Sequence, residues 1–511
     1  MRFQRLRPMV ARVCALGLVA GLAVSLTGCN AGYTAVGPAG EVDASRRDLV
    51  VAVGAEPVNL DFTTTAGAAI PQLLLGNVYE TLVTVDQGGA VVPLLAESWT
   101  LSEDRTVYEF TLRQGVLFSD GRHMTADDVV ASINAVQSEW LNAIKSQMDV
   151  VASAEAVGTE VVKVTLAQPS NQWLFSMATA VGAIFPADVN FDRATQTVGT
   201  GPFSVVEVSP GNHITLAGRA DYWGGIPAMD QITVRYLTDT TASVNGLRSG
   251  DIDMIWGMES GDQAAALEGV AGIHVSAGTS TGEVLLSFNN RQAPFDDLRV
   301  RQAFAFAIDR EAVMESATAG YGHLVAAMVT QQDPYYEDLT SEFAYDPAKA
   351  KALLAEAGVT NLHVRFDVPS RPYATTAAQV VQSQLAAVGV TATIHVLEFP
   401  AVWLDQVFTR HDFQMSVIMH SEARDLLTVL QPDYYLGFHD PAIMKAAAVA
   451  DAGTHDEWVS GMRAVVRKIV EETPGVVLYQ APTLIAANEN LTGIAVNAVT
   501  ESMDLTGLRW Q

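Results

Sequence analysis

The 511-residue chain is poor in cysteine, in long apolar segments and in basic side chains. Its two cysteines, Cys14 and Cys29, both lie near the N-terminus, so the rest of the chain offers no disulfide, thiolate metal site or cysteine nucleophile. Beyond the N-terminus no segment approaches the roughly 20 apolar residues of a transmembrane helix. With 30 Lys and Arg against 57 Asp and Glu, the formal net charge is −27. Such an acidic surface repels phosphate backbones, and we expect no nucleic acid among its partners.

The N-terminus shows the features of an export signal in their usual order. Arginines precede an apolar run over residues 13–26 that is too short to span a bilayer comfortably. Small residues in Leu26-Thr27-Gly28-Cys29 then stand directly before a cysteine, a pattern that resembles a bacterial lipobox. The resemblance implies a signal peptide over 1–28 and a lipid on Cys29, and the alternative is an ordinary signal peptide with an incidental cysteine. We expect an exported protein anchored to the cell membrane through Cys29, on the cell surface or the periplasmic side.

The remaining chain reads as a tether followed by alternating strands and helices. Residues 29–47 are rich in small side chains without apolar periodicity, which predicts a flexible tether. The apolar run Leu49–Val53 predicts a buried strand, Thr125 and Asp128 form a capping-box pattern, and apolar residues at helical spacing over 300–308 predict a helix. This alternation predicts the α/β class, in a chain long enough for at least two lobes. Further predicted elements are helices over 348–357 and 375–387 and strands over 107–112, 390–396 and 413–419.

A series of short motif blocks runs in a fixed order along most of the chain. They are Gly76–Leu82, Pro93–Trp99, Leu112–Val116, Phe118–Gly121, Thr125–Val129, Gly199–Phe203, Asp221–Trp223, Leu247–Asp253, Val300–Ala303 and Ala307–Arg310. Together these blocks resemble the peptide/nickel-type (family 5) solute-binding proteins of ABC importers.

The resemblance implies a two-lobed, periplasmic-binding-protein-like clamp of type II. Lobe one would comprise residues 48–286 and 483–511, with an extra subdomain at about 77–197, and lobe two would comprise residues 287–482. A protein of this kind captures short peptides or peptide-like solutes between its lobes and delivers them to permease subunits in the membrane. The resemblance implies no enzymatic activity and no cofactor, and we expect a monomer.

One arginine is the best candidate for a ligand contact. In the dipeptide-binding branch, an arginine in an R-P-Y segment holds the ligand's C-terminal carboxylate, and Arg371 stands in Ser370-Arg371-Pro372-Tyr373. A guanidinium fork matches a carboxylate and stays charged when enclosed. The alternative is a surface arginine that pairs with the adjacent helix.

The same branch places an aspartate of a G-W-x-G-D segment against the ligand's ammonium. The corresponding segment here runs from His420 to Asp425 and lacks that pattern, since the register places Ala423 where the aspartate would be. Glu422 and Asp425 flank this position, and either could supply the negative charge, with Asp425 preferred. Arg424 could equally bind an anionic ligand. The departure argues against ordinary dipeptide recognition, and a polar surface turn is the alternative.

His420 favours a second class of ligand. Some relatives import nickel or cobalt chelates, and a histidine in the cleft can complete the coordination of such a metal. The alternative is a buried, hydrogen-bonded histidine, and no metal site formed by the protein alone is predicted. Trp403, Tyr434 and Tyr435 are candidate aromatic walls of the cleft, with core packing as the alternative. Asn289 is a candidate ligand contact or a hinge residue.

A last motif raises an enzymatic hypothesis. Gly278-Thr279-Ser280-Thr281-Gly282 matches G-x-S-x-G, the nucleophile elbow of serine hydrolases. That motif requires a strand-to-helix turn with an exposed serine, whereas the residues that follow it, 283–288, read as a strand. A serine hydrolase is therefore a remote alternative.

Overall fold

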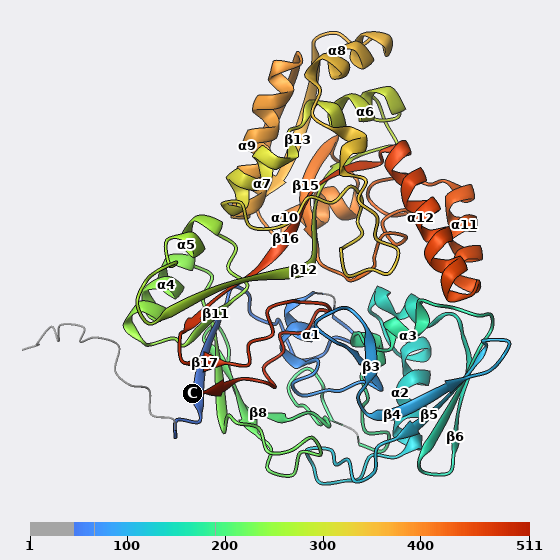
Figure 1. Cartoon of the computed structure of the whole chain (residues 1–511), viewed down its shortest axis with the longest axis vertical. Coiled ribbons are helices and arrows are strands. Elements are labelled where there is room, and N and C mark those ends of the chain that lie inside the picture. The colour runs from blue at the N-terminus through green and yellow to red at the C-terminus, as the bar shows by residue number, and fades with distance from the viewer. Residues whose placement is uncertain (1–44, 66, 190) are drawn as a thin grey trace, which may run out of the picture. The chain divides into compact units, whose positions relative to one another are not determined.

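The computed structural model describes residues 45–511 with the exception of 66 and 190 (Figure 1). The predicted signal peptide, the predicted lipid site Cys29 and most of the predicted tether lie outside the described residues. Within the described ranges, no helix combines the length and the apolar character that a membrane crossing requires.

A ten-stranded mixed sheet forms the backbone of the fold, in the order β14-β13-β15-β12-β16-β11-β1-β10-β9-β8. Strand β1 pairs in parallel with β10 and β11, and β13 pairs in parallel with β14 and β15. These two parallel groups are joined by the long antiparallel pair β12 and β16, which Figure 1 shows running from one half of the described chain to the other. The strands are β1 Asp48–Val53, β8 Phe203–Ser209, β9 His213–Gly218, β10 Gln231–Tyr236, β11 Met254–Trp256, β12 Ile273–Phe288, β13 Leu362–Pro369, β14 Val390–Leu397, β15 Met415–His420 and β16 Gly475–Asn488.

Buried apolar side chains form separate cores on the two sides of β12 and β16. The cores of lobe one are built from segments between residues 49 and 267 and between 484 and 510. The cores of lobe two are built from segments between 284 and 479. The α/β class predicted from the sequence is therefore confirmed, while the exact lobe limits at 286/287 and 482/483 remain predictions.

Lobe one carries a second, four-stranded sheet in the order β4-β5-β7-β6. Helix α2 (Ala126–Ser138) packs against it and begins with the predicted capping box, in which the Thr125 amide donates to Asp128 Oδ2 at 2.9 Å. The span 77–197 for a subdomain around this sheet remains a prediction. The strands are β4 Ala96–Leu101, β5 Val107–Leu112, β6 Val151–Val157 and β7 Val161–Leu166.

Helices cover the sheet of lobe two. The predicted caps are present, since Asp346 accepts a hydrogen bond from the Lys349 amide at 2.9 Å at the start of α8. Helix α9 begins at Pro372, three residues before the predicted start, because proline fits the first turn of a helix and Arg371 serves as the N-cap. The helices of this lobe are α6 Leu298–Ala307, α7 Arg310–Thr318, α8 Pro347–Glu356, α9 Pro372–Ala387, α10 Ala401–Trp403, α11 Pro441–Ala452 and α12 His455–Glu472.

Short elements complete the fold. They are α1 Ala69–Leu74, β2 Val83–Val85, β3 Val91–Pro93, α3 Trp173–Ser176, α4 Thr240–Ser249, α5 Gly261–Ala265, β17 Leu491–Thr492 and β18 Arg509–Trp510, with the 3₁₀ helices η1 Ala143–Met148, η2 Ala180–Gly182 and η3 Thr340–Phe343 and the π-helix η4 Leu404–Thr409.

The core of lobe one contains a buried glutamate with a full set of partners. Glu80 is 1% exposed, and its carboxylate accepts hydrogen bonds from the Tyr222 hydroxyl at 2.7 Å and from Trp223 Nε1 at 2.9 Å. Burial raises the pKa of Glu80 from its ordinary 4.5 to about 7, because these hydrogen bonds offset only part of the desolvation. The folded protein therefore holds a proton here over a pH range in which the unfolded chain has lost it.

We predict that Glu80 makes stability decrease as pH rises from about 4.5 to about 7. The raised folded-state pKa means that the stabilising proton is fully bound below pH 4.5 and is lost as pH passes through about 7. Relative to Glu80→Gln, the free energy of unfolding of the wild type should fall on the order of 2–3 kcal/mol across this window. Urea unfolding of both proteins at several pH values measures the difference in slope, and parallel pH profiles would contradict the assignment.

Candidate ligand-binding site

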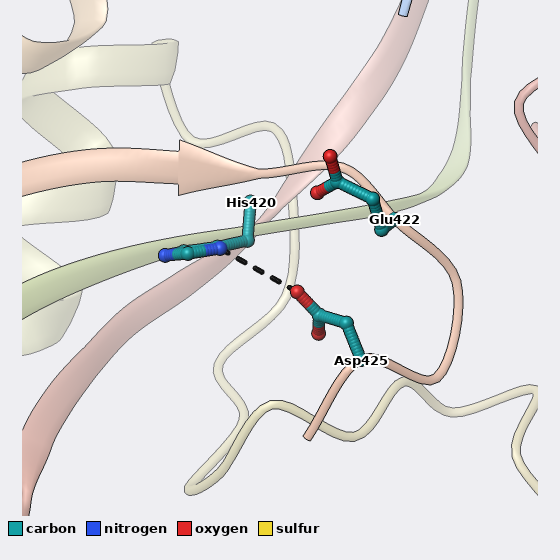
Figure 2. Close-up of side chains that lie close together, drawn as sticks. All are labelled: His420, Glu422 and Asp425. Atoms are coloured by element: carbon teal, nitrogen blue, oxygen red, sulfur yellow. Dashed lines mark ion pairs between the residues drawn. The ribbon is translucent and has the colours of Figure 1, made fainter. Parts of the chain in front are cut away.

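A group of polar side chains gathers where β15 ends. His420 Nδ1 lies 3.4 Å from Asp425 Oδ2, and one donor atom each of His420, Glu422 and Asp425 lies within 4.8 Å of the others (Figure 2). The other ring nitrogen of His420 lies 3.0 Å from the Tyr435 hydroxyl. His420 and Asp425 are buried, whereas Glu422 is exposed. This arrangement suits a cation, because two carboxylates and an imidazole point toward one another.

Glu283 adds a further carboxyl group from strand β12. It stands directly opposite His420 in the antiparallel ladder between β12 and β15, so both side chains lie on the same face of the sheet. Glu283 is 3% exposed, and its Oε2 has no hydrogen-bond partner in the part of the chain that the structure describes. Burial, followed by the charges of Asp425 and Asp333, raises the pKa of Glu283 well above its ordinary value. Burial likewise raises the pKa of Asp425, although His420 opposes this shift.

Arg424 lies beside this group, but its charge is already paired. Its Nε donates to Asp333 Oδ1 at 2.9 Å, and both side chains are largely buried. The guanidinium carbon also lies 3.6 Å from the centre of the Phe175 ring, which belongs to lobe one. The backbone of Arg424 is in the left-handed region, with φ of 58°, as the tight turn after β15 requires. An anionic ligand would have to displace Asp333 to bind this arginine.

A second polar feature lies between the lobes at the N-terminus of α9. Arg371 of lobe two forms an ion pair with Glu259, which follows β11 in lobe one. Both side chains line a cavity of about 350 Å³, whose other walls include residues just after β1, β10 and β11. Crevices beyond the carboxyl ends of parallel strands are the usual ligand sites of open α/β sheets. The cavity is also of the size that small-molecule sites have.

The two polar features are tied together through α9. The Tyr373 hydroxyl, two residues beyond Arg371, accepts a hydrogen bond from the Met419 amide at 3.1 Å. Met419 is the residue before His420 in β15. Tyr373 thus connects the first turn of α9, which follows Arg371, to the strand that ends at His420.

Residues 280–282 form the unpaired break in the ladder between β12 and β16. The Ser280 hydroxyl donates to the Ala481 carbonyl oxygen at 2.6 Å and accepts from the Gly282 amide at 2.9 Å. A Cβ on Gly278 would lie 1.8 Å from the Val496 carbonyl oxygen, so the motif needs glycine for close backbone approach. These residues sit within a strand rather than at a strand-to-helix turn, and the geometry of a nucleophile elbow is absent at Ser280.

Comparison with known proteins places this architecture in a family. Residues 90–427 match the bacterial extracellular solute-binding proteins, family 5 (middle region). The glutathione-binding protein GsiB of Salmonella typhimurium is 31% identical over 364 residues, which cover 69% of this chain and 70% of GsiB. The chain belongs to family 5 of the bacterial extracellular solute-binding proteins.

Solved structures confirm the fold of this family 5 chain. The periplasmic binding protein DppA of Helicobacter pylori matches it with a TM-score of 0.79 at 21% identity, over 91% of this chain and 99% of that one. NikA of Staphylococcus aureus gives a TM-score of 0.78 at 18% identity, over 91% and 100%. The predicted two-lobed fold and the predicted role as a solute-binding receptor for an ABC importer are thereby confirmed. The family is one of extracellular binding proteins, in agreement with the expected export.

The structure brings together some of the candidate ligand contacts and separates others. His420, Glu422 and Asp425 meet in one group, and the Tyr434 hydroxyl lies 3.5 Å from His420 Nδ1. Tyr435 is fully buried behind His420, where its hydroxyl contacts Ser287 Oγ at 2.6 Å. It is thus a support for the histidine rather than a wall of the cleft.

Two of the candidates are core residues. Trp403 is 3% exposed, packs among the aromatic side chains of lobe two, and donates from Nε1 to Ser416 Oγ at 3.0 Å. Asn289 is equally buried, and its amide donates to the carbonyl oxygens of His411 and Phe413 at 3.0 Å. This packing agrees with the alternatives of a core residue for Trp403 and a hinge residue for Asn289, and ligand contact at either one remains a prediction. The apolar neighbours of the indole and the backbone acceptors of the amide account for both residues.

Four acidic residues were not among the candidates predicted from the sequence. Glu259 and Asp333 pair with the two arginines, and Glu283 faces His420. Glu501, near the C-terminus, has an unpartnered Oε2, and burial together with the charge of Glu422 raises its pKa to about 7. Only Glu283 left a signal in the sequence, as a charged residue at the head of an apolar strand.

The lobes also contact each other at a second place, through Asp451 at the end of α11. Asp451 Oδ1 accepts from the amides of Asn171 and Gln172 at 3.0 and 2.9 Å, and Oδ2 accepts from Ser170 Oγ at 2.6 Å. These residues directly precede α3 of lobe one, where unpaired backbone donors favour a carboxylate. A single side chain of lobe two thus holds lobe one by three hydrogen bonds.

We predict that Asp451→Ala shifts the protein toward arrangements with the lobes further apart. Hydrogen bonds to a charged group contribute roughly 1.5–3 kcal/mol, so the ratio of closed to open molecules should fall about tenfold or more. Small-angle X-ray scattering should show a larger radius of gyration than in the wild type. The matched control is Asp433→Ala, which removes an exposed aspartate of the same lobe. An unchanged radius of gyration in Asp451→Ala would show that this contact does not hold the lobes together.

Proposed function

We propose that this protein captures short peptides or peptide-like solutes that carry a free carboxylate and an ammonium group. The observation that carries the proposal is Arg371, which reaches from lobe two into the cavity between the lobes and binds a carboxylate there, that of Glu259. A ligand carboxylate of the same geometry can take the place of Glu259. Two relatives support this ligand class: GsiB is named for glutathione, and the DppA structure contains the peptide STSA.

The ammonium group of the ligand is assigned to the acidic loop after β15. Asp425 is held in place by His420, and Glu422 extends next to it into solvent. The ligand then contacts loops at the ends of β13 and β15, while Glu259 and Phe175 contribute from lobe one. Binding to groups of both lobes favours arrangements in which the lobes are close, because only there are all contacts made.

The same proposal includes a membrane anchor, a monomeric state and a permease partner. Cys29 would carry the lipid that anchors the protein at the outer side of the cell membrane. The protein would act as a monomer and present its closed form to the permease subunits of an ABC importer.

We predict that Arg371→Ala weakens binding of the dipeptide Ala-Leu at least about tenfold, because truncation leaves the ligand carboxylate without its charged donor. Ala-Leu amide, which lacks the carboxylate, should bind the wild type weakly and lose little further affinity in the variant. Isothermal titration calorimetry measures both. Arg410→Ala is the matched control, since Arg410 forms an exposed ion pair with Asp405 elsewhere in lobe two. Equal losses for the peptide and its amide would refute the carboxylate assignment.

The group His420, Glu422 and Asp425 favours a second candidate, the receptor of a nickel or cobalt chelate. An imidazole nitrogen and two carboxylates within 4.8 Å of one another form a donor set that first-row transition metals accept. The NikA structure contains Ni(L-His)2, which shows this ligand class on the same fold. In this case the metal is part of the transported ligand and enters the site bound to its chelator.

Native mass spectrometry of the protein that begins at Asn30, purified without added ligand, separates the two candidates. We predict that the released material forms a series of masses of short peptides. A single compound with a transition-metal isotope pattern, bound by the wild type and lost in His420→Ala, would instead establish chelate uptake. A metal content below one per ten protein molecules in the closed complex would exclude the metal candidate.

A further inference from the structure

The loop after β15 lies among carboxyl groups that outnumber the cationic side chains beside them. Four carboxyl groups gather here from three parts of the chain: Glu283 from β12, Asp333 from the segment after α7, and Glu422 and Asp425 from the loop itself. The one arginine among them, Arg424, is paired with Asp333. Glu283, Glu422 and Asp425 are thus left without a cationic side chain as a hydrogen-bonding partner, apart from the imidazole of His420 beside Asp425. A single ligand ammonium would balance only one of these three groups.

Contacts within the fold do not account for the buried carboxyl group of Glu283. It is almost completely buried, yet its Oε2 has no partner, which is unfavourable for any carboxyl group. Its strand neighbours Val284, Leu285 and Leu286 show that the strand accepts apolar residues on either face. The register places Glu283 opposite His420, one of the residues drawn in Figure 2, with both side chains on the same face of the sheet. A partner supplied by a ligand would satisfy Oε2.

We propose that the ligand carries two cationic groups, and that Glu283 together with Glu422 binds the second one, an amine or guanidinium of a side chain. This inference rests on the proposed function, in which Asp425 binds the α-ammonium group. The cleft would therefore select basic peptides or peptide-like amines over neutral ones. Glutathione, which carries more carboxylates than ammonium groups, is a poor match for such a site.

The surroundings of the site favour an organic cation over a bare metal ion. The ring centres of Tyr434 and His420 lie 6.2 Å apart, whereas the Phe175 ring of lobe one is already covered by the guanidinium of Arg424. Aromatic faces beside carboxylates are typical of sites for ammonium and guanidinium groups.

The test compares two dipeptides that differ in one charge. Lys-Ala and norleucine-Ala have the same backbone and nearly the same length, but only Lys-Ala carries the side-chain amine. We expect the wild type to bind Lys-Ala at least about tenfold more tightly, as a charge-assisted contact to buried carboxyl groups provides. In Glu283→Gln this preference should fall to nearly one, while the affinity for norleucine-Ala stays the same. Calorimetric titration of the full protein measures all four affinities.

Two further variants make the result decisive. Glu80→Gln is the matched control, because Glu80 is a buried glutamate whose two oxygens are both hydrogen-bonded within lobe one, and it should leave the preference for Lys-Ala intact. Glu422→Gln changes an exposed side chain and therefore reports on the site even if Glu283→Gln does not fold.

The outcomes distinguish the inference from the proposed function. Equal binding of both dipeptides by the wild type would overturn the second cationic site and leave the peptide receptor in place. Binding of neither dipeptide would overturn both. Tight binding of Ni²⁺ from its chloride, lost in Glu283→Gln and accompanied by no preference for Lys-Ala, would show that the carboxylates hold a metal ion instead.

Discussion

The fold and its ligand site both depend on the backbone pairing between β12 and β16. These strands pair over Ile273–Thr279 and again from Glu283 onward, and the ladder is interrupted at 280–282. At the interruption, side chains replace the missing ladder bonds: Gln480 Nε2 donates to the Ser280 carbonyl oxygen at 2.6 Å, and Thr281 Oγ1 donates to the Ser421 carbonyl oxygen at 2.6 Å. Each lobe can therefore keep its own packed core while the chain bends at a defined point. Three buried side-chain oxygens at the bend, Thr279 Oγ1, Glu283 Oε2 and Gln480 Oε1, have no hydrogen-bond partner among the described residues.

The same break determines which groups face the ligand. Pairing resumes at Glu283, which places its carboxyl group beside His420 at the end of β15. The hydrogen bond from Thr281 fixes the first residue of the acidic loop to the bend itself. The acidic loop that carries Glu422 and Asp425 therefore begins next to the break between the two paired regions of β12 and β16.

The sequence predicted the features that depend on residues close to one another in the chain. The capping box at Thr125, the proline and aspartate at the start of α8 and the apolar strands depend on neighbours within a few residues, and all are present. The pairs Arg371 with Glu259 and Arg424 with Asp333 join residues separated by 112 and 91 positions. No spacing rule predicts such pairs, since the sheet order and register decide them. The sequence left Trp403 open between cleft and core for the same reason, because core and cleft aromatics look alike in a sequence.

The family explains why this chain binds a solute, whereas the charged groups of the site bear on which solute it binds. Arg371 and Arg424 already bind carboxylates of the protein, and Arg371 also lines the cavity of about 350 Å³. Among the described residues, Glu283, Glu422 and Asp425 have no lysine or arginine as an ion-pair partner. Attraction between unlike charges in a partly desolvated cleft is strong, whereas displacement of an internal partner offsets much of the gain. In the proposed arrangement, the ligand's carboxylate must displace Glu259, whereas its cationic groups meet carboxyl groups that have no lysine or arginine partner, so the proposed selectivity is one of charge.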